Sequence, residues 1–155
     1  MKKLLLLIII TLTLLAGCKN KPLTREKLIE KIERGEDVTE VNVSEITNMS
    51  HMFHGAESFN QDISQWDVSQ VTNMNHMFAG ASTFNQDISG WDVSNVTDMS
   101  DMFSFANSFN QDISGWDVSR VESMRSMLDG ADSFSYDLSH WADNSILYDG
   151  YMDER

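Results

Sequence analysis

A repeat of 25 residues constrains this chain more than any other feature of its sequence. Four tryptophans follow one another at that interval, namely Trp66, Trp91, Trp116 and Trp141. The same interval relates the phenylalanines Phe59, Phe84, Phe109 and Phe134. A fixed period of this length is typical of chains that stack one structural unit on the next. We therefore expect successive coils in register, with like side chains in contact.

The apolar positions within one unit predict the path of each coil. In Trp66-Asp67-Val68 apolar and polar residues alternate, which predicts a short strand with the aspartate pointing outward. Apolar residues then recur every three or four positions and indicate a helical or 3₁₀ return segment; they are Met74, Met77, Ala81 and Phe84. This pattern predicts an α/β repeat solenoid, a short leucine-rich-repeat-like stack of about four coils with a parallel sheet on one face.

The segments on either side of the repeat have different patterns. Residues 23–35 predict a helix, with Thr24 as the N-cap and Gly35 as a left-handed stop. This capping helix would cover the exposed end of the first coil, as the end of a stack requires. The repeat region is expected over residues 36–142, with a first strand at Val41 to Ser44, and residues 143–155 are expected to form a C-terminal cap or tail.

The N-terminus has the order of charged, apolar and small residues that is typical of a secretion signal. Lys2 and Lys3 precede an apolar run that is shorter than the roughly 20 residues of a membrane-spanning helix. The tetrapeptide that ends at Cys18, Leu-Ala-Gly-Cys, resembles the bacterial lipobox. This resemblance implies a signal peptide over residues 1–17, a lipid on Cys18 and a tether over 18–22. The alternative is an uncleaved N-terminal helix in which this single cysteine is inert.

The charge of the chain excludes a partner held through phosphates. There are 24 acidic and 11 basic residues, for a formal net charge of -13, so nucleic acid would be repelled. Most positive charge beyond the signal lies between Lys19 and Arg34. This end is expected to lie near anionic lipid headgroups, or else to be an ordinary solvated helix face.

The repeat motif also indicates a family. Asp62 to Phe78 reads Asp-Ile-Ser-x-Trp-Asp-Val-Ser-x-Val-Thr-Asn-Met-x-x-Met-Phe, and Asp87 to Phe103 repeats it closely. The motif resembles the BspA-like family of leucine-rich repeat surface proteins, over roughly residues 36–142. Its members are typically bacterial surface lipoproteins or secreted proteins, a few of them described as adhesive. The resemblance implies a lipid-anchored envelope protein at the outer membrane or cell surface, acting in protein interaction or adhesion.

Three aspartates that each follow a tryptophan are candidates for partner binding, namely Asp67, Asp92 and Asp117. On a strand face their carboxylates would stand about 5 Å apart and repel one another. Raised pKa values, hydrogen bonds from the following serines, cations or a basic partner would offset this repulsion. Solvated surface charge is the alternative. We expect the row to meet a protein partner, together with the residues alongside it, Gln70, Asn95 and Arg120.

Metal binding and catalysis have less support in the sequence. His51 and His76 share a repeat position and are the candidates for a shared metal ion, but the ligand set is incomplete, so no metal and no cofactor is predicted. The serines recur with the repeat and form no asymmetric catalytic set. We expect a monomer that is not an enzyme. The alternatives are a structural periplasmic lipoprotein and a metal-dependent hydrolase that uses the histidine and aspartate columns.

Overall fold

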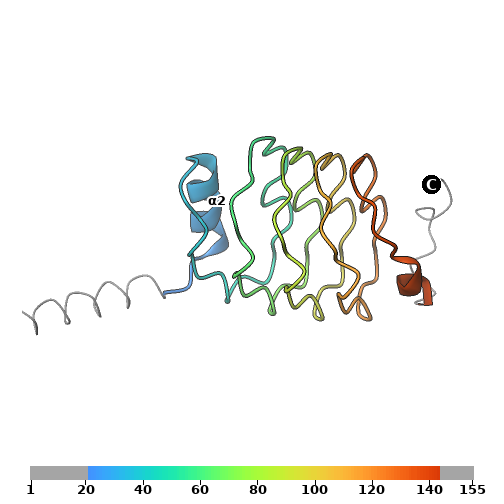
Figure 1. Cartoon of the computed structure of the whole chain (residues 1–155). Coiled ribbons are helices and arrows are strands. Elements are labelled where there is room, and N and C mark those ends of the chain that lie inside the picture. Colours follow the sequence, from blue (N-terminus) through green and yellow to red (C-terminus); the bar gives the residue numbers. More distant parts are fainter. Residues whose placement is uncertain (1–20, 144–155) are drawn as a thin grey trace, which may run out of the picture.

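The computed structural model describes residues 21–143. They contain the α-helix α2 (Arg25–Glu33) and the 3₁₀ helix η1 (Ser139–Asp143), and no β-strand is found among them. Between these helices the chain winds in a row of coils that lie side by side (Figure 1). The predicted signal peptide, the tether up to residue 20 with Cys18, and nearly all of the predicted C-terminal cap lie outside the described residues. No helix within the described range is long and apolar enough to span a membrane.

The predicted parallel sheet is not found in residues 21–143, so the α/β, leucine-rich-repeat-like solenoid with a strand face is wrong. Successive coils are joined by three isolated parallel bridges: Asn48 to Asn73, Asn73 to Asp98, and Asp98 to Ser123. These bridges precede the methionines and do not involve the predicted strand at Trp66-Asp67-Val68. There the backbone closes turns, because Trp66 N donates to Ile63 O at 3.1 Å and Val71 N to Val68 O at 2.8 Å.

Aspartate side chains explain why no strand forms after the tryptophans. Asp67 Oδ1 accepts hydrogen bonds from Ser69 N at 3.1 Å and from Ser69 Oγ at 2.7 Å. Such a turn gives the backbone a local partner that competes with strand pairing. In the predicted first strand, Asn42 Oδ1 accepts the same two bonds from Ser44. The alternation of apolar and polar residues therefore reports burial correctly, but the backbone turns instead of extending.

Backbone hydrogen bonds between coils run along the methionine side. Met49 N donates to Asn73 O and Met74 N to Asp98 O, both at 2.9 Å. Within a coil, the predicted helical or 3₁₀ return segment is a run of turns, in which Met77 N donates to Met74 O at 3.1 Å. These residues make backbone bonds both to their own coil and to the next, which leaves no continuous helical or strand pattern.

Like side chains from successive coils meet in the interior. The ring of Phe78 stacks on Phe53 at 5.2 Å and on Phe103 at 5.6 Å between ring centroids. Trp91 is 4% exposed, and its indole Nε1 donates to Ile63 O at 3.2 Å. Trp66 and Trp116 make the equivalent bond to a carbonyl of the preceding turn of chain. Since the coils share a common pattern of buried side chains, the interior consists of columns of similar residues.

Helix α2 covers the first coil. The Thr24 side chain accepts a hydrogen bond from Lys27 N, and Gly35 follows the helix with a φ of 66°. Leu28 is fully buried in the core. The Arg25 guanidinium donates to Asn48 O at 3.1 Å and to Ser50 O at 2.6 Å. In later coils, the carbonyls at these repeat positions accept backbone N–H groups from the coil before. The first coil has α2 in front of it instead of a coil, and the Arg25 guanidinium supplies the donors.

Candidate interaction site

The aspartates Asp67, Asp92 and Asp117 are all exposed, and each is placed by the turn that follows a buried tryptophan. Each carboxylate accepts the backbone N–H of the serine two residues further on, at 3.0 to 3.1 Å. The Ser94 hydroxyl adds a bond to Asp92 at 2.6 Å. All of these bonds end on Oδ1, so the serines leave Oδ2 to other donors. The turns therefore present one carboxylate at the same place on three coils.

Serine hydrogen bonds lower the pKa of two aspartates of this row, Asp92 and Asp117. The Ser94 hydroxyl and then its amide hold the pKa of Asp92 below the ordinary value of 3.8, although the nearby Asp117 acts in the opposite direction. The Ser119 side chain and backbone likewise lower the pKa of Asp117. Raised pKa values, one of the four compensations expected from the sequence, are therefore wrong for these two aspartates. Both are ionised at neutral pH.

The three candidates beside the row occupy one repeat position. Asn95 Nδ2 donates to Ser69 O at 2.8 Å, and Arg120 Nη1 donates to Asn95 Oδ1 at 2.7 Å. Gln70 is exposed at the equivalent place one coil earlier. The structure therefore links Asn95 and Arg120 directly, and it places one guanidinium at the edge of the acidic row.

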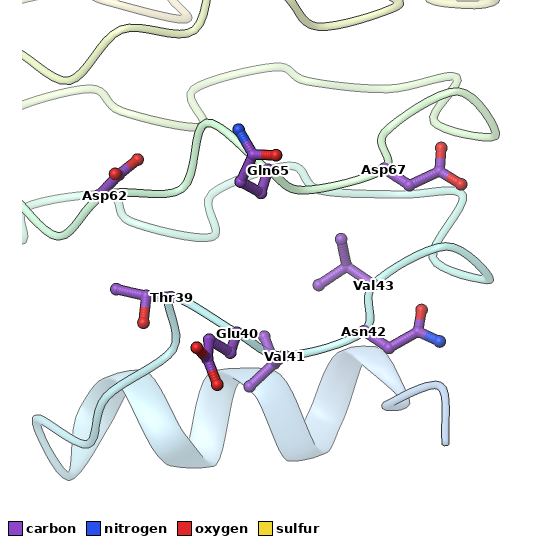
Figure 2. A pocket seen from close by; sticks show the side chains of 8 residues that line it. All are labelled: Thr39, Glu40, Val41, Asn42, Val43, Asp62, Gln65 and Asp67. Atoms are coloured by element: carbon purple, nitrogen blue, oxygen red, sulfur yellow. The ribbon is translucent and has the colours of Figure 1, made fainter. Parts of the chain in front are cut away.

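A pocket with a volume of 490 Å³ lies at the end of the row next to α2. Its lining residues come from two neighbouring stretches of chain: Thr39, Glu40, Val41, Asn42 and Val43 from one, and Asp62, Gln65 and Asp67 from the other. Figure 2 shows the first stretch running between α2 and the second. Glu40, Asp62 and Asp67 are the acidic residues among those that line it, and Figure 2 shows the Glu40 carboxylate on the side toward α2. The repeat pattern gave no sign of this pocket, which forms where residues 39–43 of the first coil meet the next coil.

The candidate histidines lie together on another part of the surface. The rings of His51 and His76 stack with their centroids 4.8 Å apart, and the ring of His54 meets that of His51 edge-on with a centroid distance of 5.4 Å. Burial lowers the pKa of His51, and the charges of His76, His54 and Arg25 lower it further. Within residues 21–143, no group of three or more histidine, cysteine, aspartate or glutamate side chains is arranged to hold a metal ion. The shared repeat position thus brings the rings of His51 and His76 into contact, and no metal is assigned to them.

Phe105 is a surface residue that the sequence analysis did not single out. Its side chain is 59% exposed and its φ is 57°. It occupies the repeat position of Gly55, Gly80 and Gly130. A signal was present in the sequence, since an aromatic residue interrupts a column of glycines.

Removing the Ser94 hydroxyl tests how the carboxylates of the row are held. Asp92 has a lowered pKa in the folded protein, so its hydrogen bonds stabilise the fold above the unfolded pKa, near 3.8, and this contribution disappears as the pH falls through the folded value. We expect Ser94→Ala to lower the free energy of unfolding at pH 7, and we expect the difference from wild type to shrink below about pH 4. Urea titrations at several pH values measure it.

Ser82→Ala is the matched control, because the Ser82 hydroxyl donates to a backbone carbonyl, Glu57 O, at 3.3 Å. Its effect should not depend on pH over the same range. A Ser94→Ala difference that stayed constant from pH 7 to pH 2 would contradict the assignment of the carboxylate as the acceptor.

The fold and the acidic row define a class of protein: a short stack of similar coils, closed by a helix, whose repeated side chains form a scaffold with exposed carboxylates. The chain belongs to the family described as "Mycoplasma protein of unknown function, DUF285", whose model matches residues 25–141. The match begins with the first residue of α2 and ends at Trp141, so it includes the helical cap together with the repeats. No curated protein and no solved structure matches the chain. The resemblance to the BspA-like family stays a prediction.

Proposed function

We propose that this protein is a lipid-anchored component of the bacterial cell envelope that binds a basic protein partner and does not act as an enzyme. The binding surface, here called the acidic turn face, consists of Asp67, Asp92 and Asp117 with Gln70, Asn95 and Arg120 alongside. One observation carries the proposal: three exposed carboxylates are repeated on successive coils and are held by the same serine hydrogen bonds.

Charge favours a basic partner for this face. Asp92 and Asp117 have lowered pKa values and so keep their charge at neutral pH. The pocket that Asp67 lines is also lined by two further acidic residues, Glu40 and Asp62. A row of like charges attracts a cationic surface and speeds its association. A basic partner would also relieve the mutual repulsion of the row.

The proposed anchor rests on the sequence around Cys18. The basic residues of α2 are balanced by Glu26, Glu30 and Glu33, and Lys31 is paired with Glu36, so the helix itself offers little net charge to a membrane. The orientation rests on the acidic coils, which anionic headgroups repel. Protease treatment of intact cells distinguishes a surface protein, which is digested, from a structural periplasmic lipoprotein, which is protected.

Neutralising the row tests the acidic turn face. In Asp67→Asn, Asp92→Asn and Asp117→Asn combined, each asparagine Oδ1 can accept the same serine bonds, as Asn42 does from Ser44, so the turns should remain. We expect the affinity for a fluorescent nona-lysine peptide, measured by anisotropy at pH 7, to fall by about ten-fold, because three charge contacts are lost. The difference should decrease at high salt.

A control variant with the same change in net charge is Glu33→Gln, Glu57→Gln and Glu122→Gln combined, since these glutamates are exposed and lie outside the acidic turn face and its repeat positions. Because salt screens charges that lie away from the binding surface, this variant should change the affinity for nona-lysine less than about two-fold. Equal affinities of the two triple variants would show that overall charge, and not the acidic turn face, binds the peptide.

A further inference from the structure

Phe105 has a backbone conformation that its side chain disfavours. Its φ of 57° lies in the left-handed region, where the corresponding Gly55, Gly80 and Gly130 have φ values of 67° to 73°. This region is sterically costly for residues with a Cβ and most unusual for bulky ones. The other non-glycine residues with a positive φ in the described range are His51, His76, Asp101 and Ser126. Phe105 alone among them has a bulky hydrocarbon side chain.

Burial does not compensate for this strain. Phe105 is 59% exposed, whereas Phe103, two residues earlier, is fully buried. A glycine at this position would suit the backbone, and the core does not need the ring. A strained and exposed aromatic residue is therefore better explained by a contact outside the chain than by folding.

The next coil holds the ring in place. A Cβ atom on Gly130 would lie 2.5 Å from Phe105 Cδ1 and 2.9 Å from Cε1, so the ring lies directly against the Gly130 backbone. Phe105 N donates to Asp129 O at 2.7 Å. A side chain that is already fixed loses little conformational entropy when it binds a partner.

Two aspartates belong to the coil on which the ring lies. Asp129 precedes Gly130, and Asp132 follows it by two residues; both are exposed. Asn107 Nδ2 donates to Gly130 O at 3.2 Å and to Asp132 Oδ2 at 3.1 Å, which ties the two coils together here. The ion pairs of the described residues include neither aspartate. An aromatic face beside carboxylates attracts an ammonium or guanidinium group, because the ring quadrupole and the negative charges act in the same direction.

We propose that Phe105, Asp129 and Asp132 form a second contact surface, the Phe105 surface, which binds an arginine side chain of a basic protein partner. This rests on the proposed function, since it adds an aromatic anchor to a protein that acts by binding. The residues are separate from those of the acidic turn face, so each surface can be altered alone.

Two variants that restore the repeat separate the Phe105 surface from aromatic exposure in general. Phe105→Gly restores the glycine of the other units. Tyr136→Gln restores the glutamine of Gln61, Gln86 and Gln111 and removes the other large exposed hydrophobic side chain of the described range. The full chain is studied in nanodiscs of phosphatidylcholine. The probes are a nona-arginine peptide and a nona-citrulline peptide, which has the same shape without the charge, and anisotropy measures their binding.

We expect Phe105→Gly to weaken nona-arginine binding at least about five-fold, as the loss of a cation–π contact predicts, and not to lower the urea midpoint of unfolding. Tyr136→Gln should change the affinity less than two-fold, and nona-citrulline should bind neither variant nor wild type. Together, a stable Phe105→Gly protein and weakened binding would support the proposal.

Three results would overturn it. The first is unchanged nona-arginine binding by Phe105→Gly. If the triple asparagine variant loses binding in that case, the acidic turn face is supported and the Phe105 surface is not. The second is equal binding of nona-citrulline, which would exclude recognition of the cation. The third is an oligomer that Phe105→Gly converts to a monomer in size-exclusion chromatography, which would make a second copy of the chain the occupant. Loss of binding in Phe105→Gly alone would instead support this surface and remove the acidic turn face.

Discussion

Replacing Trp91 by alanine should lower the free energy of unfolding by about 3 to 5 kcal/mol, as for other buried aromatic residues. The side chain is 4% exposed, and its ring centroid lies 6.3 Å from that of Phe78. The substitution leaves a cavity between coils, and it leaves Ile63 O without the indole donor that now lies 3.2 Å away. Urea unfolding of the full chain, followed by circular dichroism, measures the loss.

Trp91→Phe is the control for the two parts of this effect. It keeps most of the buried ring and removes the hydrogen bond, so it should cost less than Trp91→Ala. A loss below about 1 kcal/mol in Trp91→Ala would contradict the placement of the indole in a closely packed column, since such a small value is typical of surface positions.

Gly130→Ala should lower the free energy of unfolding by roughly 2 to 4 kcal/mol, from two separate causes. The φ of Gly130 is 67°, which disfavours any residue with a side chain. The new Cβ would also lie 2.5 Å from Phe105 Cδ1, so the ring would have to move. Thermal and urea unfolding measure the sum of the two.

A comparison with Gly55→Ala separates these causes. Gly55 has a φ of 69°, but a Cβ there would meet nothing within 4 Å, so only the backbone cost of about 1 to 2 kcal/mol is expected. In a Phe105→Gly background, Gly130→Ala should cost as little as Gly55→Ala. If Gly130→Ala cost the same with and without Phe105, the contact between the ring and Gly130 would be refuted.

The repeat located the buried positions but not the backbone that carries them. The tryptophan, phenylalanine and methionine columns could be read from their spacing, and most of these side chains are buried. The sheet could not be read in this way, because alternation reports which side chains face the core and not whether the backbone pairs with a neighbour or closes a turn. Asp67 and Ser69 form a turn, and the same residue types would have been acceptable on a strand face.

The candidate site was predictable to a similar extent. The exposed row of Asp67, Asp92 and Asp117 followed from the position of each aspartate beside a buried tryptophan. The direction of the pKa shifts did not follow, since the pattern was compatible both with raised pKa values and with serine hydrogen bonds, and only the turn brings Ser94 and Ser119 within hydrogen-bonding distance of the carboxylates. The pocket beside Glu40 could not be predicted, because it forms where residues 39–43 of the first coil meet the next coil at Asp62, Gln65 and Asp67.

By itself, the sequence determined the interval between coils, the residues that fill their interior and the excess of negative charge. These are properties of residue type and spacing, and they do not depend on which groups meet. Only the tertiary structure decided that Arg25 closes the edge of the first coil, that turns replace strands, and that Phe105 lies against Gly130. Each of these depends on geometry, either of the local turn or of a contact between separate coils, and spacing along the chain does not specify that geometry.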